Sequence, residues 1–332
     1  MNIVTSKNAA GIISTGRALP VSRVTNFDLE EIMDTSDRWI KARTGIEERR
    51  IITNDETNSK LCTRASRIAL ERANLTPQDI DLLIVATVTP DLTLPSTACL
   101  VQAELDACNA AVFDLVAGCT GFLYGLNVAE QYIKNNAAKN ILLIGADTLS
   151  PVVDWRDRNT AVLFGDGAGA VVLGKVEDGS GVLASKMFSD GTRADLLYIP
   201  AGGSVRPATM RTVKERMHYI KMSGPEIFKF AVTVMIDSTL QVLEMCGKTP
   251  AELDYLIPHQ ANERIINLAY KKMGLKPEQV LLNINRYGNM SSACIPIMLD
   301  EAVEQGKFQS GDLIAMVSFG AGLTWGAAVL KW

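Results

Sequence analysis

Cys119 is the side chain in this sequence best suited to nucleophilic chemistry. It follows the short apolar run at residues 111–116 and precedes apolar residues that recur at helical spacing, from Phe122 to Ile133. The pattern predicts a strand, a tight turn and a helix, with the thiol in the first helical turn. Free N–H groups and the helix dipole stabilise a thiolate there, so we expect the pKa of Cys119 to lie below the ordinary cysteine value. An isolated cysteine at such a turn is also typical of a small buried packing residue.

His259 and Asn289 supply the complementary chemistry. His259 ends a short apolar strand, and Asn289 lies in a Tyr-Gly-Asn turn. A neutral imidazole and a side-chain amide can direct two N–H donors at one oxygen, which suits stabilisation of an enolate. Taken singly, each has a simpler interpretation, as a hydrogen-bonded polar residue at a strand end or as a turn residue.

An internal duplication indicates how these residues are positioned. The segment TPQDIDLLI at residues 76–84 resembles TPAELDYLI at residues 249–257, an offset of 173 residues. The strand-like runs at residues 141–145 and 314–318 have the same offset, and an FGxG turn followed by an apolar strand occurs near the end of each half. Strands and helices alternate throughout, which favours a layered α/β fold made of two similar units.

The same offset relates the two candidate turns. Adding 173 to Cys119 gives Ser292, which lies in the Asn289 turn. The nucleophile and the Asn289 motif therefore begin equivalent helices in two halves, residues 1–175 and 176–332. We expect these two helix starts to face one pocket at the junction of the halves.

Composition excludes several function classes. The chain has 332 residues, of which 47% are hydrophobic and 21% charged, and its net charge of -4 argues against a nucleic-acid-binding surface. No apolar run is long enough for a membrane span, and the first residues lack a signal-peptide pattern, so we expect a cytoplasmic protein. The six cysteines show no CxxC spacing and there are only two histidines, which predicts reduced thiols and no metal site.

Six motifs, taken together and in order, resemble the β-ketoacyl-acyl-carrier-protein synthase III family of type II fatty-acid synthesis. The resemblance covers almost the whole chain. The motifs are DTSDRWIKARTGI at 34–46, AGCTGF at 117–122, FGDGAGA at 164–170, PHQAN at 258–262, YGN at 287–289 and GLTWG at 322–326.

This resemblance implies a thiolase fold, with two pseudo-symmetric βαβαβαββ halves that form a five-layered αβαβα sandwich. It also implies a two-step reaction without a cofactor. Cys119 takes the acyl group from an acyl-CoA primer, and malonyl-acyl-carrier-protein then loses CO2 and attacks the acyl enzyme. The backbone amides of Cys119 and Ala321 match the family's oxyanion hole, while His259 and Asn289 match the donors of the condensation step.

The resemblance further assigns residues to substrate binding. Trp39 and Arg158 match the pair that holds the adenine of CoA, and Arg43 matches a phosphate contact. Arg264 matches a carrier-protein contact. Lys271 and Lys272 lie further along the same helix and are more typical of a solvated face.

Leu94 matches the residue of the family's dimer loop that closes the partner's acyl channel. The resemblance thus implies a homodimer in which Leu94 limits primer length. Leu is smaller than the aromatic residue sometimes found there, so the channel is expected to accept primers larger than acetyl.

A few positions depart from the family pattern and bear on the pathway. Thr120, Met290, Cys294 and Ala321 replace more common residues beside the catalytic motifs. They leave open an alternative function, a starter condensing or acyl-transfer enzyme of a specialised-metabolite pathway that is polyketide or quinolone-like. A plant-type polyketide synthase is a further, less favoured alternative. A degradative thiolase is disfavoured because the second FGxG turn lacks a cysteine, and a non-catalytic relative is disfavoured because the trio is present.

Overall fold

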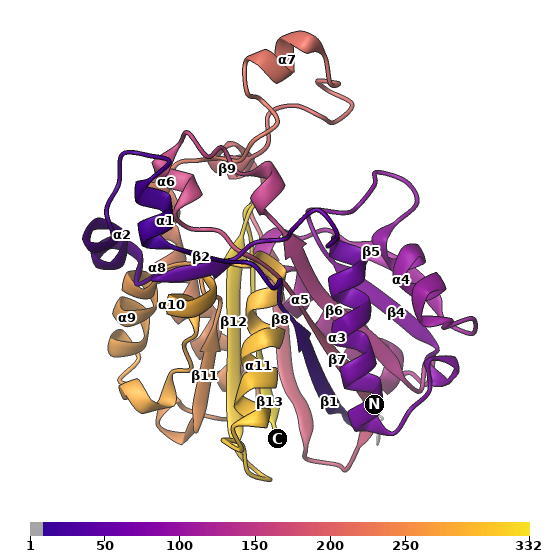
Figure 1. Cartoon of the computed structure of the whole chain (residues 1–332). Helices are drawn as coiled ribbons and strands as arrows, with labels where there is room; N and C mark the ends of the chain where they lie inside the picture. The colour runs from indigo at the N-terminus through magenta and orange to yellow at the C-terminus, as the bar shows by residue number, and fades with distance from the viewer. Residues whose placement is uncertain (1–8) are drawn as a thin grey trace.

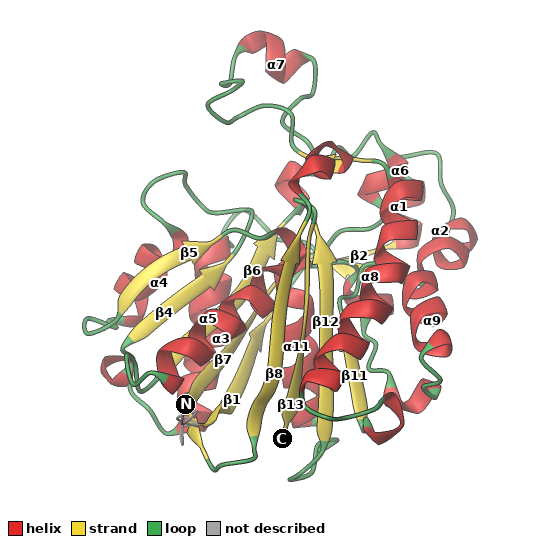
Figure 2. Ribbon diagram, turned by 180° about the vertical axis from the view of Figure 1, so that it is seen from behind, coloured by secondary structure: helices red, strands yellow, loops and turns green. Residues whose placement is uncertain are grey.

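Two β-sheets form the framework of the computed structural model, which describes residues 9–332 (Figures 1 and 2). The first sheet has, in spatial order, β1 (Ala9–Ala18), β7 (Asp166–Val176), β6 (Ile141–Thr148), β4 (Leu82–Ala86) and β5 (Ala111–Leu115). The second has β11 (Tyr255–Pro258), β12 (Leu313–Gly320), β13 (Thr324–Lys331) and β8 (Gly181–Ser189). Two short ribbons pair β2 (Arg23–Thr25) with β3 (Glu48–Arg50), and β9 (Leu197–Tyr198) with β10 (Lys221–Met222).

The two sheets repeat one topology, which confirms the predicted duplication. In the first, β4 and β6 are parallel and β7 runs antiparallel between β6 and β1. In the second, β11 and β12 are parallel and β13 runs antiparallel between β12 and β8. The two halves differ at one edge: β5 has no full counterpart, and a single bridge between Leu256 and Val280 takes its place.

Two equivalent helices lie between the sheets. A 3-10 turn, η2 (Gly118–Thr120), leads into α5 (Gly121–Lys134), and 173 residues later η7 (Ser291–Ala293) leads into α11 (Cys294–Glu304). Apolar side chains of both helices pack with those of both sheets in one buried cluster that includes Ile84, Leu126, Met298 and Met316. This packing buries the continuous apolar runs of the parallel strands on both faces.

Further helices cover the outer faces. α3 (Asn58–Ala73) and α4 (Thr97–Leu105) pack on the first sheet, while α8 (Gly224–Met245) and α9 (Glu263–Lys272) pack on the second. The order helix, sheet, helix, sheet, helix is the predicted five-layered sandwich, and that prediction is confirmed. None of the helices within residues 9–332 is long and apolar enough to cross a membrane.

Several short helices and 3-10 turns connect the main elements. They are α1 (Asn26–Glu30), α2 (Asp37–Thr44), α6 (Arg158–Ala161), α10 (Ile284–Tyr287) and α7 (Met210–Lys214), with 3-10 turns at Pro77–Asp79, Ser150–Val152, Gly191–Leu196, Pro250–Glu252 and Pro277–Gln279. The segment that carries α7 stands away from the body of the molecule (Figure 1).

Candidate active site

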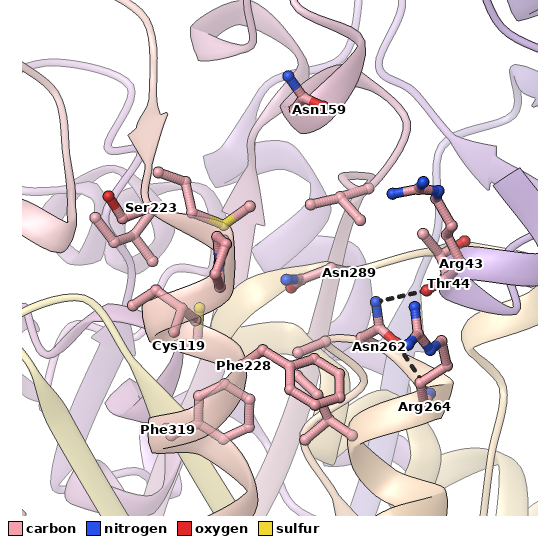
Figure 3. A pocket seen from close by; sticks show the side chains of 18 of the residues that line it. Arg43, Thr44, Cys119, Asn159, Ser223, Phe228, Asn262, Arg264, Asn289 and Phe319 are labelled. Carbon is pink, nitrogen blue, oxygen red and sulfur yellow. Dashed lines mark hydrogen bonds between the residues drawn. The ribbon is translucent and has the colours of Figure 1, made fainter.

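A cleft of about 680 Å³ brings the three predicted catalytic residues together. Cys119, His259 and Asn289 all line it, although 140 residues of sequence separate the first two. Arg43 and Arg264 line it as well and are exposed, whereas His259 and Asn289 are buried, so the cleft runs from an exposed mouth to a buried end. Figure 3 shows Cys119, Asn289 and Phe319 around this hollow.

Close backbone packing fixes the turn that carries Cys119. Gly118 has a φ of 56°, a left-handed conformation that glycine adopts without a side-chain clash. A Cβ atom on Gly118 would lie 2.8 Å from the backbone nitrogen of Ala321, and one on Gly320 would lie 2.5 Å from that of Cys119. The end of β12 therefore lies directly against the nucleophile turn. The backbones of Cys119 and Ala321, the predicted oxyanion-hole pair, are neighbours because of it.

Three hydroxyl groups from the second half hold the carbonyl groups of this turn. Thr324 donates a hydrogen bond to the carbonyl of Ala117 at 2.8 Å. Ser292 donates to that of Gly118 at 3.0 Å, and Ser318 to that of Cys119 at 2.8 Å. Three consecutive peptide groups of the turn are thus fixed by side chains from η7, β12 and β13.

The expected fall in the pKa of Cys119 is wrong for this structure. Burial is the largest influence and raises the pKa of the thiol to about 12, and the nearby Asp147 carboxylate adds to the rise. Cys119 lies in η2, before the first residue of α5, and the helix start does not offset the desolvation of a thiolate. Desolvation therefore favours the thiol over the thiolate at Cys119.

His259 is neutral in the same pocket. Its side chain is almost fully buried, and burial lowers its pKa to about 3. The ring packs edge-on against Phe319 with 5.4 Å between centroids, and its Nδ1 atom has no hydrogen-bond partner within the described chain. A neutral imidazole carries one N–H donor, which is the property that the predicted role requires.

The turn around Asn289 orients the side-chain amide. The backbone N–H of Ser291 donates to Oδ1 of Asn289 at 2.9 Å, which leaves the Nδ2 amino group to act as a donor. The backbone of Asn289 is held from both sides, because its N–H donates to the carbonyl of Leu163 and its carbonyl accepts from Gly165. The FGDG motif of the first half therefore supports the YGN turn of the second.

The predicted CoA-binding residues gather at the mouth. Ser36 caps α2 by accepting a hydrogen bond from the N–H of Trp39 at 3.2 Å, which fixes the start of the helix. The guanidinium groups of Arg43 and Arg158 lie 4.7 and 5.1 Å from the centre of the Trp39 ring. Trp39 and Arg43 line the cleft. Arg158 extends from α6 to the Trp39 ring, and its guanidinium donates a hydrogen bond to the backbone carbonyl of Asp34.

Arg264 lies on the other side of the mouth, in the first turn of α9. Its guanidinium is 5.6 Å from the ring centre of Phe228, a residue of α8 that also lines the cleft. Asn262 caps α9 by accepting from the N–H of Arg264 and donates to the carbonyl of Arg43, as Figure 3 shows. Lys271 and Lys272 are exposed in the last turn of α9.

Leu94 does not line this cleft. It is 84% exposed, in the loop between β4 and α4. Near it, Leu92 and Val116 are also exposed, beside the edge strand β5. The single chain therefore leaves Leu94 without a covering partner.

Sequence reasoning missed several residues that form the site. Phe228, Phe230 and Met222 line the cleft, and Ser318 holds the carbonyl of Cys119. Asp147 is fully buried and accepts hydrogen bonds from the N–H groups of Val88 and Ser292. Of these residues, the sequence pointed only to Ser292, since the 173-residue offset pairs it with Cys119. Within residues 9–332 no group of three or more His, Cys, Asp or Glu side chains could hold a metal ion.

Comparison with known protein families matches both halves of the chain. Residues 113–191 match the 3-oxoacyl-[acyl-carrier-protein (ACP)] synthase III model, and residues 243–332 match the model of its C-terminal region. The β-ketoacyl-acyl-carrier-protein synthase III of Caldanaerobacter subterraneus subsp. tengcongensis is 55% identical over 326 residues, which cover 98% of each chain. That of Clostridioides difficile is 50% identical over 323 residues, covering 97% of this chain and 98% of the relative.

Solved structures agree with this assignment. The 3-oxoacyl-acyl-carrier-protein synthase III of Aquifex aeolicus superimposes with a TM-score of 0.90 at 49% identity, covering 97% of this chain and 100% of the other. The priming β-ketosynthase of the R1128 polyketide pathway gives 0.91 at 32% identity, covering 98% and 96%. The identities of 49–55% to the synthase III proteins exceed the 32% identity to the polyketide enzyme, which favours fatty-acid synthesis over a specialised pathway. The chain belongs to the β-ketoacyl-acyl-carrier-protein synthase III family of condensing acyltransferases, which initiate fatty-acid synthesis.

Proposed function

We propose that this chain condenses an acyl-CoA primer with malonyl-acyl-carrier-protein and thereby initiates type II fatty-acid synthesis. The products are 3-oxoacyl-carrier protein, CO2 and CoA. One observation carries the proposal: a half-buried thiol, a neutral imidazole and an oriented amide line one cleft in a chain that belongs to this family.

In the first half-reaction, Cys119 acts as the nucleophile. Its sulfur adds to the thioester carbonyl of the primer, the C–S bond to CoA breaks, and CoA leaves as a thiol with the proton that Cys119 gives up. The backbone N–H groups of Cys119 and Ala321 stabilise the oxyanion of the tetrahedral intermediate. Because burial keeps the free thiol protonated, proton loss accompanies substrate binding or attack.

In the second half-reaction, His259 and Asn289 donate hydrogen bonds to the malonyl thioester oxygen. As the C–C bond to the carboxylate breaks and CO2 leaves, the electron pair forms an enolate whose charge these donors stabilise. The enolate carbon attacks the acyl enzyme, and Cys119 leaves and regains one proton. A neutral His259 suits this role, since its pKa of about 3 keeps it uncharged throughout the physiological range.

At the mouth, Trp39 and Arg158 bind the adenine of CoA, and Arg43 binds a phosphate group. The cluster of one indole and two guanidinium groups supports these roles. Its flat faces can stack on adenine, and its positive charge can bind phosphate. Arg264 contacts the acidic carrier protein from the opposite side of the mouth, and its exposure supports that role.

The enzyme acts as a homodimer. β5 is an edge strand, and a second copy could continue the sheet there. Leu94, 84% exposed, and Val116, 76% exposed, flank that edge and would be covered. In the dimer, Leu94 closes the acyl channel of the other subunit. Residues 1–175 supply the nucleophile, and residues 176–332 supply His259 and Asn289.

We place the enzyme in the cytoplasm. All six cysteines, each within the described residues, are free thiols, including the exposed Cys99 and Cys108. Exposed free thiols suit a reducing compartment. The proposed reaction needs no cofactor.

The test separates the two half-reactions. Cys119→Ala should abolish the covalent acyl adduct that intact-mass spectrometry detects after incubation with an acyl-CoA panel, with an unchanged fold. His259→Ala and Asn289→Ala should acylate normally but lose condensation of the acyl enzyme by about a hundredfold or more. An acyl adduct on Cys119→Ala, or near-normal condensation by either of the other variants, would contradict the corresponding role.

A further inference from the structure

Two serine hydroxyls hold the peptide groups on either side of Cys119, and neither belongs to the proposed catalytic set. Ser292 Oγ donates to the carbonyl of Gly118 at 3.0 Å, and Ser318 Oγ donates to the carbonyl of Cys119 at 2.8 Å. The partners are 174 and 199 residues apart in sequence and join the two halves of the fold. Both serines are buried.

The bond from Ser292 fixes the direction of the Cys119 N–H. The carbonyl of Gly118 and the N–H of Cys119 belong to one planar trans peptide group, so they point in opposite directions. A hydroxyl that holds the oxygen therefore also aims the N–H. Ser318 holds the next peptide group in the same way, and together the two bonds fix the backbone on both sides of the Cys119 Cα atom.

The bond from Ser292 is not needed merely to satisfy a buried carbonyl. The carbonyl of Gly118 already accepts a hydrogen bond from the N–H of Gly121 in the 3-10 turn. The hydroxyl of Ser292 is a second donor to the same oxygen. Its effect is therefore on the orientation of the peptide group rather than on an unpaired polar atom.

Ser292 is itself held in place, as an orienting group must be. Its backbone N–H donates to the buried carboxylate of Asp147 at 3.1 Å. A Cβ atom on Gly121 would lie 2.9 Å from Ser292 Oγ, and one on Gly145 would lie 2.3 Å from the carbonyl oxygen of Ser292. Two glycines thus leave the space in which this serine is packed.

We propose that Ser292 and Ser318 are positioning residues for thioester chemistry, which orient the Cys119 N–H toward the oxyanion. The proposal rests on the roles of Cys119 and Ala321 given above. It predicts that the serines matter for attack on a carbonyl, where an oxyanion forms, and not for the access or basicity of the thiol.

The experiment compares two reactions of the same sulfur. Acylation by acetyl-CoA forms an oxyanion, whereas alkylation by iodoacetamide is a displacement at carbon that forms none. Ser292→Ala and Ser318→Ala should each slow acylation about tenfold, because misplacement of a reacting group by less than 1 Å costs up to a hundredfold. Alkylation should stay within about twofold of the unaltered protein, since it uses no oxyanion donor.

Ser14→Ala is the matched control. Ser14 is also buried, and its hydroxyl donates to the backbone carbonyl of Ala69 at 2.6 Å, between β1 and α3. It should change neither reaction. If Ser318→Ala does not fold, Ser318→Cys keeps a side chain of similar size with a weak donor and should show a smaller loss of acylation.

Unchanged acylation in Ser292→Ala and Ser318→Ala would overturn the proposal. Equal losses of acylation and alkylation would overturn it too, because they indicate a general disturbance of the thiol. A Cys119→Ala variant in the same series separates this outcome from failure of the proposed function. If that variant still becomes acylated, the nucleophile has been assigned wrongly, whatever the serines do.

Discussion

Gly320→Ala tests the close packing of β12 against the nucleophile turn. A Cβ atom at position 320 would lie 2.5 Å from the backbone nitrogen of Cys119 and 2.9 Å from its Cβ. Ordinary contacts of a Cβ atom begin at 3.4 Å, so the two backbones must separate by about 0.9 Å, the difference between 3.4 and 2.5 Å. The φ of Gly320 lies outside the left-handed region, so the clash and not the backbone conformation decides the result.

Such a displacement should cost far more activity than stability. Moving a reacting group by about 1 Å lowers a rate by roughly a hundredfold. Insertion of one methyl group into a packed interior costs about 1–3 kcal/mol of the free energy of unfolding. Since domains of ordinary stability retain several kcal/mol after that loss, the variant should fold and acylate slowly.

Quenched-flow acylation with acetyl-CoA, read by intact mass, measures the rate, and thermal unfolding measures stability. Gly191→Ala is the control, because a Cβ atom there has no neighbour within 4 Å. It should match the unaltered protein in both measurements. Acylation of Gly320→Ala within about threefold of the unaltered rate would refute the reasoning, because the change predicted from the clash is roughly a hundredfold.

Three further predictions concern the pocket, the mouth and pH. Leu94→Phe should reduce turnover of longer or branched acyl-CoAs and spare acetyl-CoA; an unchanged chain-length profile in a dimeric variant would exclude Leu94 from the channel. Arg264→Ala should raise KM for malonyl-carrier protein more than KM for acyl-CoA, and equal changes would speak against a carrier contact. Because burial lowers the pKa of His259 from 6.5 to about 3, the unfolded state binds its proton first as the pH falls. The free energy of unfolding should therefore drop by about 2 kcal/mol between neutral pH and roughly pH 5 through this group. In urea titrations, His259→Gln should lose that part of the pH dependence. If the free energy of unfolding changed with pH equally in the variant and the unaltered protein, His259 would not be its source.

The sequence by itself determined the fold and the three catalytic candidates. The 173-residue offset pairs β4 with β11 and α5 with α11, because each half must repeat its apolar pattern to build the same layers. Cys119, His259 and Asn289 could be found because their residue types are chemically distinctive. Cys119 and His259 each follow an apolar strand, whereas the strand expected before Asn289 is wrong, since the short helix α10 precedes that residue. Parallel strands of a layered α/β fold place the residues after their carboxyl ends in one region.

Only the tertiary structure decided the electrostatics and the support of the site. The local pattern predicted a low pKa for Cys119, whereas the pKa is raised because distant segments surround the thiol and desolvate it. The hydroxyls of Ser318 and Thr324 reach the nucleophile turn from about 200 residues away, as the 2.8 Å bonds show. Desolvation and hydrogen-bond partners depend on which segments meet in space, and a local sequence pattern does not contain that information.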